Sequence, residues 1–460
     1  MTSVDRRLTL FHAARAAAAR VVPVRDIELS GVSSDTRSLV PGQLFVALRG
    51  PNFDGHSFVG QAERAGAVAA LVSDPNVETS LPLVVVEDTL AALAAIANDY
   101  RRRVDPTVLA ITGSAGKTTT KELVAHLLTE GRELFRTPGN YNNQIGLPLS
   151  LLSMAPSTDI AVLELGMSAA GEIAELARIC EPDIGLITNV AAAHLETLGT
   201  IEGVAAAKGE LFAALTRQGT AVVNLDDPQI LRVINGCPAS RITFGRALHA
   251  DVRLLRTEAD GAFTRATFAI GGYEWTLVLK TPAPHNALNA AAAIAAGLAV
   301  GESADLLLER LERFPFSIDR RLSLRDEGGV LWLDDYYNAN PLSMRAALQA
   351  LMQLSATRRI AVLGDMLELG TSAVEAHRAL GRFVASLGID VLIGVGPLMR
   401  QACDAAIEMA TTSATRLTVE HLADSSSASA RVAALAQPGA ALLVKGSRGM
   451  KMEHVFGGTR

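Results

Sequence analysis

The chain has 460 residues, of which 49% are hydrophobic and 20% charged, with a formal net charge of −6. This composition is typical of a globular protein with full cores, and the length favours about three domains. The sequence has no long basic run and only 4% aromatic residues, which argues against a nucleic-acid or membrane-surface partner. The three cysteines are widely spaced, as in proteins of a reducing compartment. Arginines interrupt the alanine-rich N-terminal stretch, which argues against a signal peptide, and the longest apolar run, residues 290–300, is too short to span a membrane. We therefore expect a soluble, cytoplasmic protein.

The first boundary in the chain is the polar stretch at residues 101–106, which precedes an apolar run at residues 108–111. That run predicts a strand, and a helical pattern begins at Glu122. Between them lies a glycine-rich loop, whose candidate ATP-binding residues are Gly113, Ser114, Ala115, Gly116, Lys117, Thr118 and Thr119. Strand, glycine loop and helix together form a phosphate cradle, in which Lys117 reaches the β/γ-phosphates and the Thr118 hydroxyl binds Mg²⁺. Ile111 occupies the place of the first glycine of the common P-loop, so the loop is a short form. A strand-to-helix turn with chance residues is the weaker alternative, because all three elements agree.

Polar residues follow the next predicted strands of the central part. Glu164 ends one apolar strand and His194 follows another, at the sheet edge where α/β proteins bind ligands. Glu164 is a candidate Mg²⁺ ligand or a capping residue, His194 a ligand or a structural histidine, and Lys208 a site residue or a surface lysine. Asn142 and Asn143 stand in a glycine- and asparagine-rich loop, which predicts a binding loop or a plain turn.

The pattern changes between residues 244 and 280, where two alternating segments flank Gly271-Gly272. A two-glycine link predicts an antiparallel hairpin or meander within the central domain. Asn286 and Asn289 open the alanine-rich helix that follows, as ligand contacts or, for Asn286, as a cap. The second boundary lies near residues 314–317.

The last third repeats the alternation of apolar strands and helices, which predicts a second parallel sheet covered on both faces. Two polar segments follow strands there, one from Asp334 to Pro341 and one from Lys445 to Arg448. Each is either part of a cleft or a polar surface turn.

Taken together, these segments resemble the Mur ligases, the ATP-dependent amide ligases of peptidoglycan precursor synthesis. The resemblance covers almost the whole chain and includes residues 34–37, 41–48 and 54–56 near the N-terminus. Its most specific segments, Tyr337-Asn338-Ala339-Asn340-Pro341 and residues 363–370, resemble the branch that adds D-alanyl-D-alanine. Two departures are Asp319-Arg320-Arg321-Leu322, where the family usually has Gly-Arg before the leucine, and Tyr336 after Asp335, where serine is commoner. Arg321 is aligned with the family's phosphate-contacting arginine, and Arg320 stays open.

The resemblance implies an α/β fold of three domains. They are a smaller UDP-muramoyl-peptide-binding domain at 1–103, a central P-loop ATPase-type domain with a mostly parallel sheet at 104–316, and a Rossmann-like C-terminal domain at 317–460. It implies a monomeric enzyme that uses ATP to join D-alanyl-D-alanine to UDP-N-acetylmuramoyl-tripeptide through an acyl phosphate. The alternatives are a sister ligase that adds a single amino acid, and a non-catalytic ATP switch, which gives no reason for the Asn-Asn loop.

The resemblance also implies the roles of single residues. The catalytic set is Lys117, Glu164, His194, Lys208 and Arg321. The metal ligands are Thr118, Glu164, His194 and Lys208, the last as a carbamoylated lysine. The further ATP contacts are Asn286, Asn289, Asp335 and Asn338. The substrate contacts are Ser34, Asp35, Thr36, Arg37, Asp54, His56, Asn142, Asn143, Lys445, Ser447 and Arg448.

Overall fold

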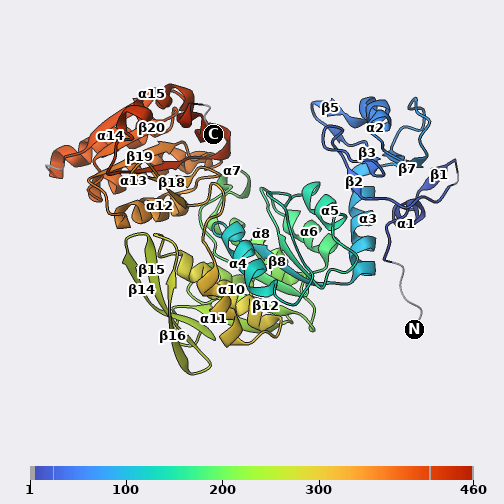
Figure 1. Ribbon diagram of the computed structural model, residues 1–460, viewed down its shortest axis with the longest axis horizontal. Helices are drawn as coiled ribbons and strands as arrows, with labels where there is room; N and C mark the ends of the chain where they lie inside the picture. Colours follow the sequence, from blue (N-terminus) through green and yellow to red (C-terminus); the bar gives the residue numbers. More distant parts are fainter. Residues whose placement is uncertain (1–5, 24, 414–415, 458–460) are drawn as a thin grey trace.

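The computed structural model describes residues 6–23, 25–413 and 416–457. Three lobes follow one another along the chain, and the two outer lobes stand apart on the same side of the central lobe (Figure 1). Each lobe is built around its own β-sheet. The predicted three-domain α/β architecture is therefore confirmed.

The N-terminal lobe is the smaller α/β unit. Its strands are β1 (Arg20–Val22), β2 (Val32–Ser33), β3 (Leu44–Val46), β4 (Arg49–Gly50), β5 (Phe53–Asp54), β6 (Ala69–Val72) and β7 (Leu83–Val85). Its helices are α1 (Leu10–Ala16), the 3₁₀ helix η1 (Gly55–Phe58), α2 (Val59–Arg64) and α3 (Thr89–Val104). The main sheet has the order β1-β7-β6-β3-β2 and is parallel except between β1 and β7. The long helix α3 reaches the central lobe, where the Tyr100 hydroxyl donates to the carbonyl of Met154 at 2.8 Å (Figure 1).

The central lobe contains a nine-stranded sheet. Its strands are β8 (Thr107–Thr112), β9 (Leu134–Arg136), β10 (Ile160–Glu164), β11 (Ile184–Ile187), β12 (Thr220–Asn224), β13 (Ser240–Gly245), β14 (Val252–Asp260), β15 (Phe263–Ile270) and β16 (Tyr273–Leu279). Its helices are α4 (Lys117–Leu128), α5 (Gly146–Leu151), α6 (Glu172–Cys180), α7 (Leu195–Leu198), α8 (Ile201–Ala213), α9 (Pro228–Val233), α10 (Asn286–Ala299) and α11 (Ala304–Arg313). The order is β16-β15-β14-β13-β12-β11-β8-β10-β9, parallel from β9 to β14 and antiparallel beyond.

The parallel strands are apolar on both sides because helices cover both faces of the sheet. In β8, Leu109 and Ile111 pack with α4 and α10, whereas Val108 and Ala110 pack with α5, α6 and α8. Successive side chains of a strand point to opposite faces, so each face takes every second residue. The sheet's carboxyl edge then carries the loops that form the candidate site.

The predicted hairpin is present, and it extends the central sheet. β15 and β16 pair antiparallel up to Ile270 and Tyr273, with Gly271 and Gly272 as the two-residue turn. Both glycines have positive φ, +58° and +87°, as a tight turn of this kind requires. The meander therefore extends the central sheet beyond β14 by two antiparallel strands.

The C-terminal lobe has a six-stranded sheet of order β17-β18-β22-β19-β20-β21, parallel except between β17 and β18. Its strands are β17 (Ser323–Glu327), β18 (Val330–Asp335), β19 (Arg358–Gly364), β20 (Val391–Val395), β21 (Thr418–Leu422) and β22 (Ala440–Lys445). Its helices are α12 (Pro341–Gln353), η2 (Gly370–Ser372), α13 (Ala373–Ser386), α14 (Met399–Ser413), α15 (Ser425–Leu435), η3 (Arg448–Met450) and η4 (Met452–Phe456).

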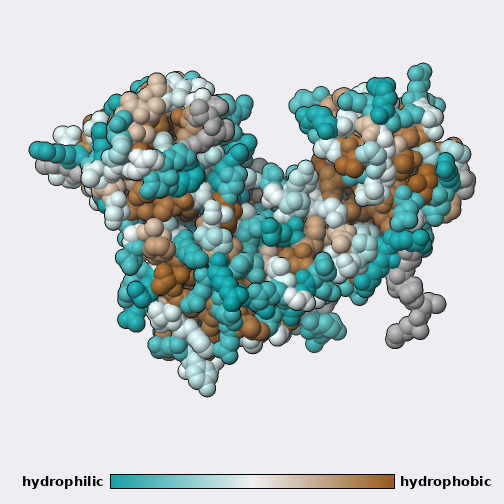
Figure 2. Space-filling model, in the orientation of Figure 1, coloured by the Kyte–Doolittle hydropathy of each residue, from teal (hydrophilic) through white to brown (hydrophobic). Residues whose placement is uncertain are grey.

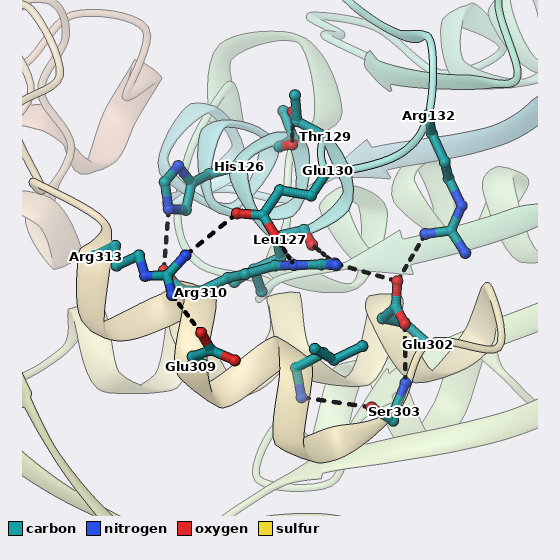
Figure 3. A network of polar contacts seen from close by, with 12 residues as sticks. His126, Leu127, Thr129, Glu130, Arg132, Glu302, Ser303, Glu309, Arg310 and Arg313 are labelled. Carbon is teal, nitrogen blue, oxygen red and sulfur yellow. Dashed lines mark hydrogen bonds and ion pairs between the residues drawn. The ribbon is translucent and has the colours of Figure 1, made fainter.

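A polar network fastens the end of α4 to α11 in the central lobe (Figure 3). Arg310, which is 6% exposed, donates to the Leu127 carbonyl at 2.7 Å and to Glu302 at 3.1 Å. The His126 ring in turn contacts the Arg310 carbonyl at 3.0 Å. Because α4 begins at the glycine-rich loop, this network holds the far end of the helix that carries the loop.

Candidate active site

The glycine-rich loop has the conformation that its glycines allow. Gly113 and Gly116 have φ of +151° and +80°, and each lies where a side chain would collide with a neighbour. A Cβ on Gly113 would lie 1.9 Å from the Thr188 Oγ1, and one on Gly116 would lie 2.5 Å from the Asn289 Oδ1. The Lys117 Nζ donates to the Gly113 carbonyl at 2.7 Å, so the loop folds around its own lysine.

A second loop, residues 188–191 after β11, braces the glycine-rich loop. The Asn189 side chain accepts from the Ala115 N–H at 3.0 Å and donates to the Ala115 carbonyl at 2.9 Å. The Ser114 hydroxyl donates to the Ala191 carbonyl and accepts from the Ala191 N–H. Sequence reasoning missed this brace, although its position at a strand end was a usable signal.

Glu164 ends β10 and joins two predicted site residues. One carboxylate oxygen accepts from the Thr118 hydroxyl and the other from the Asn142 amide, both at 2.8 Å. Only 2% of Glu164 is exposed, and both partners are neutral groups. A buried carboxylate beside a hydroxyl suits a hard divalent cation. Asn143 instead uses its side-chain oxygen to accept from the N–H groups of Ile145 and Gly146.

Lys208 lies within α8, nearer its end than its start, and is 2% exposed. Burial, with a contribution from the nearby charge of Lys117, lowers the pKa of Lys208 well below its ordinary value. No hydrogen bond or ion pair joins its Nζ to any other residue that the structure describes. An ammonium ion does not fit a cation site, whereas the neutral amine that burial favours can react.

His194 precedes α7 in the left-handed conformation, with φ of +54°. Its Nδ1 lies 2.6 Å from a carboxylate oxygen of Glu368, which belongs to the C-terminal lobe. Hydroxyl, carboxylate and imidazole are all groups that bind divalent cations, so Thr118, Glu164 and His194 fit such a role. Within the described ranges, however, no three His, Cys, Asp or Glu side chains form a ready-made metal cluster.

The residues expected at the nucleoside lie at the start of α10 and the end of β18. The Asn289 amide donates to the Asn286 Oδ1 at 3.0 Å, and the Asn286 amide donates to the Thr281 hydroxyl at 3.1 Å. The N-cap of α10 is His285, so the capping alternative for Asn286 is wrong. Asp335 forms a buried ion pair of 2.6 Å with Lys445.

One cavity of about 860 Å³ gathers these groups from both lobes. Among the predicted residues, its walls include Ser114, Ala115, Gly116, Lys117, Thr119, Asn142, Asn143, Glu164, His194, Asn286, Asn289, Arg321, Asp335, Asn338 and Lys445. Gly113, Thr118 and Lys208 are not among the wall residues. Asp226, Asp227 and Gln229, which follow β12, also line the cavity and were missed, although the strand-end rule could have found them.

A contact within the C-terminal lobe holds the arginine that faces this cavity. Arg321 lines the wall and its guanidinium carbon lies 3.8 Å from the centre of the Tyr337 ring, whereas Arg320 pairs with Asp319. The Asn340 amide donates across the domain boundary to the Ser114 carbonyl at 3.3 Å.

Ser447 and Arg448 are not in the walls of this cavity. The Ser447 hydroxyl accepts from the Leu367 N–H at 2.9 Å and is buried. Arg448 is exposed and pairs with Glu453. Of this predicted substrate segment, only Lys445 reaches the cavity.

The predicted contacts of the N-terminal lobe form two clusters outside the cavity. The first is Ser34 to Arg37, where a hydrogen bond from the Arg37 guanidinium lowers the pKa of Asp35 to about 2. The second is Asp54 and His56, where the backbone and ring of His56 lower the pKa of Asp54 to about 2. An open gap separates this lobe from the C-terminal lobe (Figure 2).

Comparisons with known proteins cover most of the chain. Residues 28–101 match the Mur ligase family catalytic domain, residues 111–297 the Mur ligase middle domain, and residues 320–448 the Mur ligase glutamate ligase domain. The chain is 38% identical over 435 residues to the UDP-N-acetylmuramoyl-tripeptide--D-alanyl-D-alanine ligase of Escherichia coli (strain K12), covering 94% of this chain and 93% of that enzyme.

Two crystal structures resemble the chain over nearly its whole length. MurF from Acinetobacter baumannii matches with a TM-score of 0.88 and 31% identity, covering 98% of each chain. MurF ligase from Thermotoga maritima in complex with ADP matches with a TM-score of 0.81 and 30% identity, covering 93% of this chain and 96% of that chain. In the part of the chain that the structure describes, no helix has the length and apolar character needed to cross a membrane.

Proposed function

The chain belongs to the Mur ligase family, and from this premise we propose that it joins D-alanyl-D-alanine to UDP-N-acetylmuramoyl-tripeptide. It is an ATP-dependent amide ligase of peptidoglycan precursor synthesis. The observation that carries the proposal is the single cavity in which Lys117 and Glu164 of the central lobe meet Arg321 and Asn338 of the C-terminal lobe. The single-amino-acid alternative is not favoured, because the relative that covers more than nine-tenths of the chain adds the dipeptide.

The reaction needs an activated carboxylate, since a carboxylate at neutral pH is a poor acyl donor. The tripeptide carboxylate attacks the γ-phosphorus of ATP and ADP leaves, which gives an acyl phosphate. The amine of D-alanyl-D-alanine then attacks the acyl carbon, loses a proton, and expels phosphate from the tetrahedral intermediate. Phosphoryl transfer depends mainly on positioning and on neutralising charge.

Each part of the cavity has a role in that scheme. Lys117 and the loop N–H groups hold the β/γ-phosphates, and Arg321 adds a positive charge from the C-terminal lobe. Asn286 and Asn289, which orient each other, contact the adenine. Asp335 and Asn338 contact the nucleoside from the C-terminal side; Lys445 holds both, through the Asp335 carboxylate and the Asn338 carbonyl.

Mg²⁺ supplies charge neutralisation at the phosphates when it is bound. Thr118 and Glu164 would hold one ion, and His194 and Lys208 would contribute to a second. The hydrogen bonds that orient the Glu164 carboxylate support the first assignment.

Lys208 would contribute to the second Mg²⁺ site only as a carbamate. Its buried, neutral amine can attack the carbon of CO₂ and lose a proton, which converts a cation into a ligating anion. The lowered pKa and the lack of a hydrogen-bonding partner among the described residues support this modification. Mass spectrometry under CO₂ and activity of Lys208→Ala with added acetate test it. An unmodified wild type with full activity in bicarbonate-free buffer would contradict it.

The remaining assignments follow the domains. We propose that residues 1–103 bind the UDP-muramoyl peptide through Ser34, Asp35, Thr36, Arg37, Asp54 and His56, that residues 104–316 bind ATP, and that residues 317–460 complete the site. Asn142, Asn143 and Lys445 are the proposed contacts to the peptide ends; Ser447 and Arg448, which lie outside the cavity walls, stay predictions from the sequence. The enzyme would act as a cytoplasmic monomer in cell-wall synthesis, and through it in cell shape and division.

A phosphate-release assay with purified protein, ATP and UDP-N-acetylmuramoyl-tripeptide tests the function. We expect sustained release only when D-alanyl-D-alanine is present, together with formation of the pentapeptide product by mass spectrometry. Lysine and diaminopimelate with the UDP-muramoyl dipeptide serve as the comparison. Faster turnover with either single amino acid would replace the proposal by the sister activity.

A further inference from the structure

One asparagine of the neighbouring loop binds three of the four polar backbone groups of Ser114 and Ala115, the middle of the glycine-rich loop. Since β8 and β11 are adjacent parallel strands, the loops that follow them leave the sheet side by side. The Asn189 carbonyl accepts from the Ser114 N–H at 3.0 Å. Its side-chain oxygen accepts from the Ala115 N–H at 3.0 Å, and its side-chain nitrogen donates to the Ala115 carbonyl at 2.9 Å. Asn189 therefore holds Ala115 from both sides of its backbone.

The N–H groups of the glycine-rich loop fall into two classes as a result. Those of Ser114 and Ala115 are occupied by Asn189, so neither is available to a phosphate. Those of residues 116–119, by contrast, have no hydrogen-bond partner among the described residues. They lie at the start of α4, where a helix leaves its first donors unpaired and attracts anions. The phosphate-binding donors of the loop are therefore confined to the beginning of the helix.

The loop that carries Asn189 is itself held from the opposite side by the end of β12. The Asn224 amide, on a residue that is 2% exposed, donates to the Thr188 carbonyl at 2.9 Å. The Asp227 carboxylate accepts from the Val190 N–H at 2.7 Å. These two contacts flank Asn189 directly along the chain. Its backbone is thus fixed on both sides, and its amide presents a fixed donor and a fixed acceptor to the glycine-rich loop.

The glycine-rich loop needs such support because its own sequence leaves it free. Gly113 and Gly116 both have positive φ, and glycine loses more conformational freedom on ordering than any other residue. A protein that adopts its binding conformation only part of the time binds its ligand more weakly in the same proportion. Hydrogen bonds from a fixed neighbour raise that fraction before the ligand arrives.

We propose that Asn189 is a positioning residue for nucleotide binding, which holds Ser114 and Ala115 so that the N–H groups of residues 116–119 form the phosphate cradle. The inference rests on the proposed function, in which this loop holds the β/γ-phosphates of ATP. Asn189 acts through the loop and takes no part in the chemistry. The Thr188 hydroxyl, which donates to the Ala115 carbonyl at 2.6 Å, adds to the same support.

Hydrogen exchange of the nucleotide-free protein, resolved to single N–H groups by mass spectrometry, tests the support without relying on activity. We expect the Ala115 N–H to exchange slowly in the wild type and about 5- to 150-fold faster in Asn189→Ala, the factor that two neutral hydrogen bonds supply. Asn98→Ala is the matched control. Asn98 is also partly exposed, and its amide donates to the Ile179 carbonyl at 2.9 Å, which joins α3 to α6 outside the cavity. Exchange at Ala115 should be unchanged in this control.

Calorimetric titration with ADP and Mg²⁺ supplies the second readout. We expect the Kd for ADP to rise about 5- to 150-fold in Asn189→Ala and to stay unchanged in Asn98→Ala. In the ligase assay the KM for ATP should rise by the same factor in Asn189→Ala, with the KM for D-alanyl-D-alanine unchanged and kcat within a few-fold of wild type. A general structural defect would lower kcat and affect both substrates.

The Thr188 hydroxyl gives a conservative pair of variants for the same contact. Thr188→Ser keeps a hydroxyl and should bind ADP nearly as tightly as the wild type. Thr188→Val keeps the shape, loses the donor to the Ala115 carbonyl, and should weaken ADP binding about 2- to 10-fold. This pair carries the test if Asn189→Ala fails to fold, and equal ADP affinities in the two variants would then overturn the proposal.

The readouts separate this inference from the proposed function. If Asn189→Ala keeps slow exchange at Ala115, or exchanges faster but binds ADP with wild-type affinity, Asn189 does not position the loop for nucleotide. If exchange and ADP affinity both change as expected but the wild-type protein never consumes D-alanyl-D-alanine, the role of Asn189 stands and the proposed reaction is wrong.

Discussion

Gly116→Ala should damage the nucleotide loop through one identifiable collision. Gly116 precedes α4 with φ of +80°, and its new Cβ would lie 2.5 Å from the Asn289 Oδ1. A non-glycine residue in this left-handed conformation costs about 1–2 kcal/mol. Crowding a buried side chain adds about 1–3 kcal/mol. Since Asn289 is only 9% exposed, we expect the full sum of about 2–5 kcal/mol.

Gly171→Ala isolates the backbone cost. Gly171 precedes α6 in the same conformation, with φ of +87°, but nothing lies within 4 Å of its Cβ position. It should therefore lose only about 1–2 kcal/mol. In differential scanning calorimetry of the intact protein, the transition of a domain of 150–250 residues moves about 2–4 °C per kcal/mol. The KM for ATP should rise in Gly116→Ala, because the loop backbone is displaced, and stay unchanged in Gly171→Ala.

Adding Asn289→Ala to Gly116→Ala gives a double-mutant cycle for this pair of residues. If Asn289 is the colliding group, the double variant should be more stable than the sum of the single variants predicts, by about 1–3 kcal/mol. Equal shifts of the transition in Gly116→Ala and Gly171→Ala, with an unchanged KM for ATP in both, would refute the reasoning.

Three further perturbations follow from the same geometry. Arg310→Leu removes the donor to the buried Leu127 carbonyl and one of the two arginines that pair with Glu302, which keeps Arg132, so it should lose about 1–3 kcal/mol by calorimetry. Exposed Arg313→Leu in the same network should lose less than about 1 kcal/mol. Lys117→Ala should lower kcat for phosphate release about 10²- to 10³-fold while its melting transition stays near that of the wild type. Burial, with the charge of Lys445, lowers the pKa of His285 from 6.5 to about 4. The unfolded chain then takes up that proton first, so denaturant titrations should show stability falling as the pH drops from about 6.5 to 4, and less so in His285→Gln.

The parts of the site that could be predicted from the sequence depend on residues that are close together in the chain. The glycine loop lies between a strand and a helix that begins at Lys117, so three local patterns agree about one place. The hairpin at Gly271-Gly272 has the same basis, since a two-residue turn determines the register of both strands. Glu164 was predicted because parallel strands expose their carboxyl ends at one edge.

The parts that were missed depend on residues far apart in the chain. Asn340 meets Ser114 across 226 positions, and Asn189 braces Ala115 across 74. Neither asparagine differs in local pattern from one that caps a helix or forms a turn. Glu368 was quoted as part of a motif, but its contact with His194 depends on how two domains dock, which no periodicity encodes.

The way the domains dock explains why the C-terminal domain contacts the central cavity while the N-terminal lobe does not. The C-terminal domain already closes the nucleotide cavity through polar contacts such as those of Asn340 with Ser114 and Glu368 with His194, whereas the N-terminal lobe stands apart (Figure 1). A neutral hydrogen bond contributes about 0.5–1.5 kcal/mol in net terms. Contacts of that size can be broken and reformed in each turnover, and a ligand that bridges both domains shifts the balance toward closure by its difference in affinity for the two states. The ATP contacts that we propose on both walls of one cavity would meet that condition. We therefore expect nucleotide binding and closure of the catalytic half to be a single thermodynamic step, with the UDP-linked substrate arriving from the lobe that we propose to bind it, across the gap.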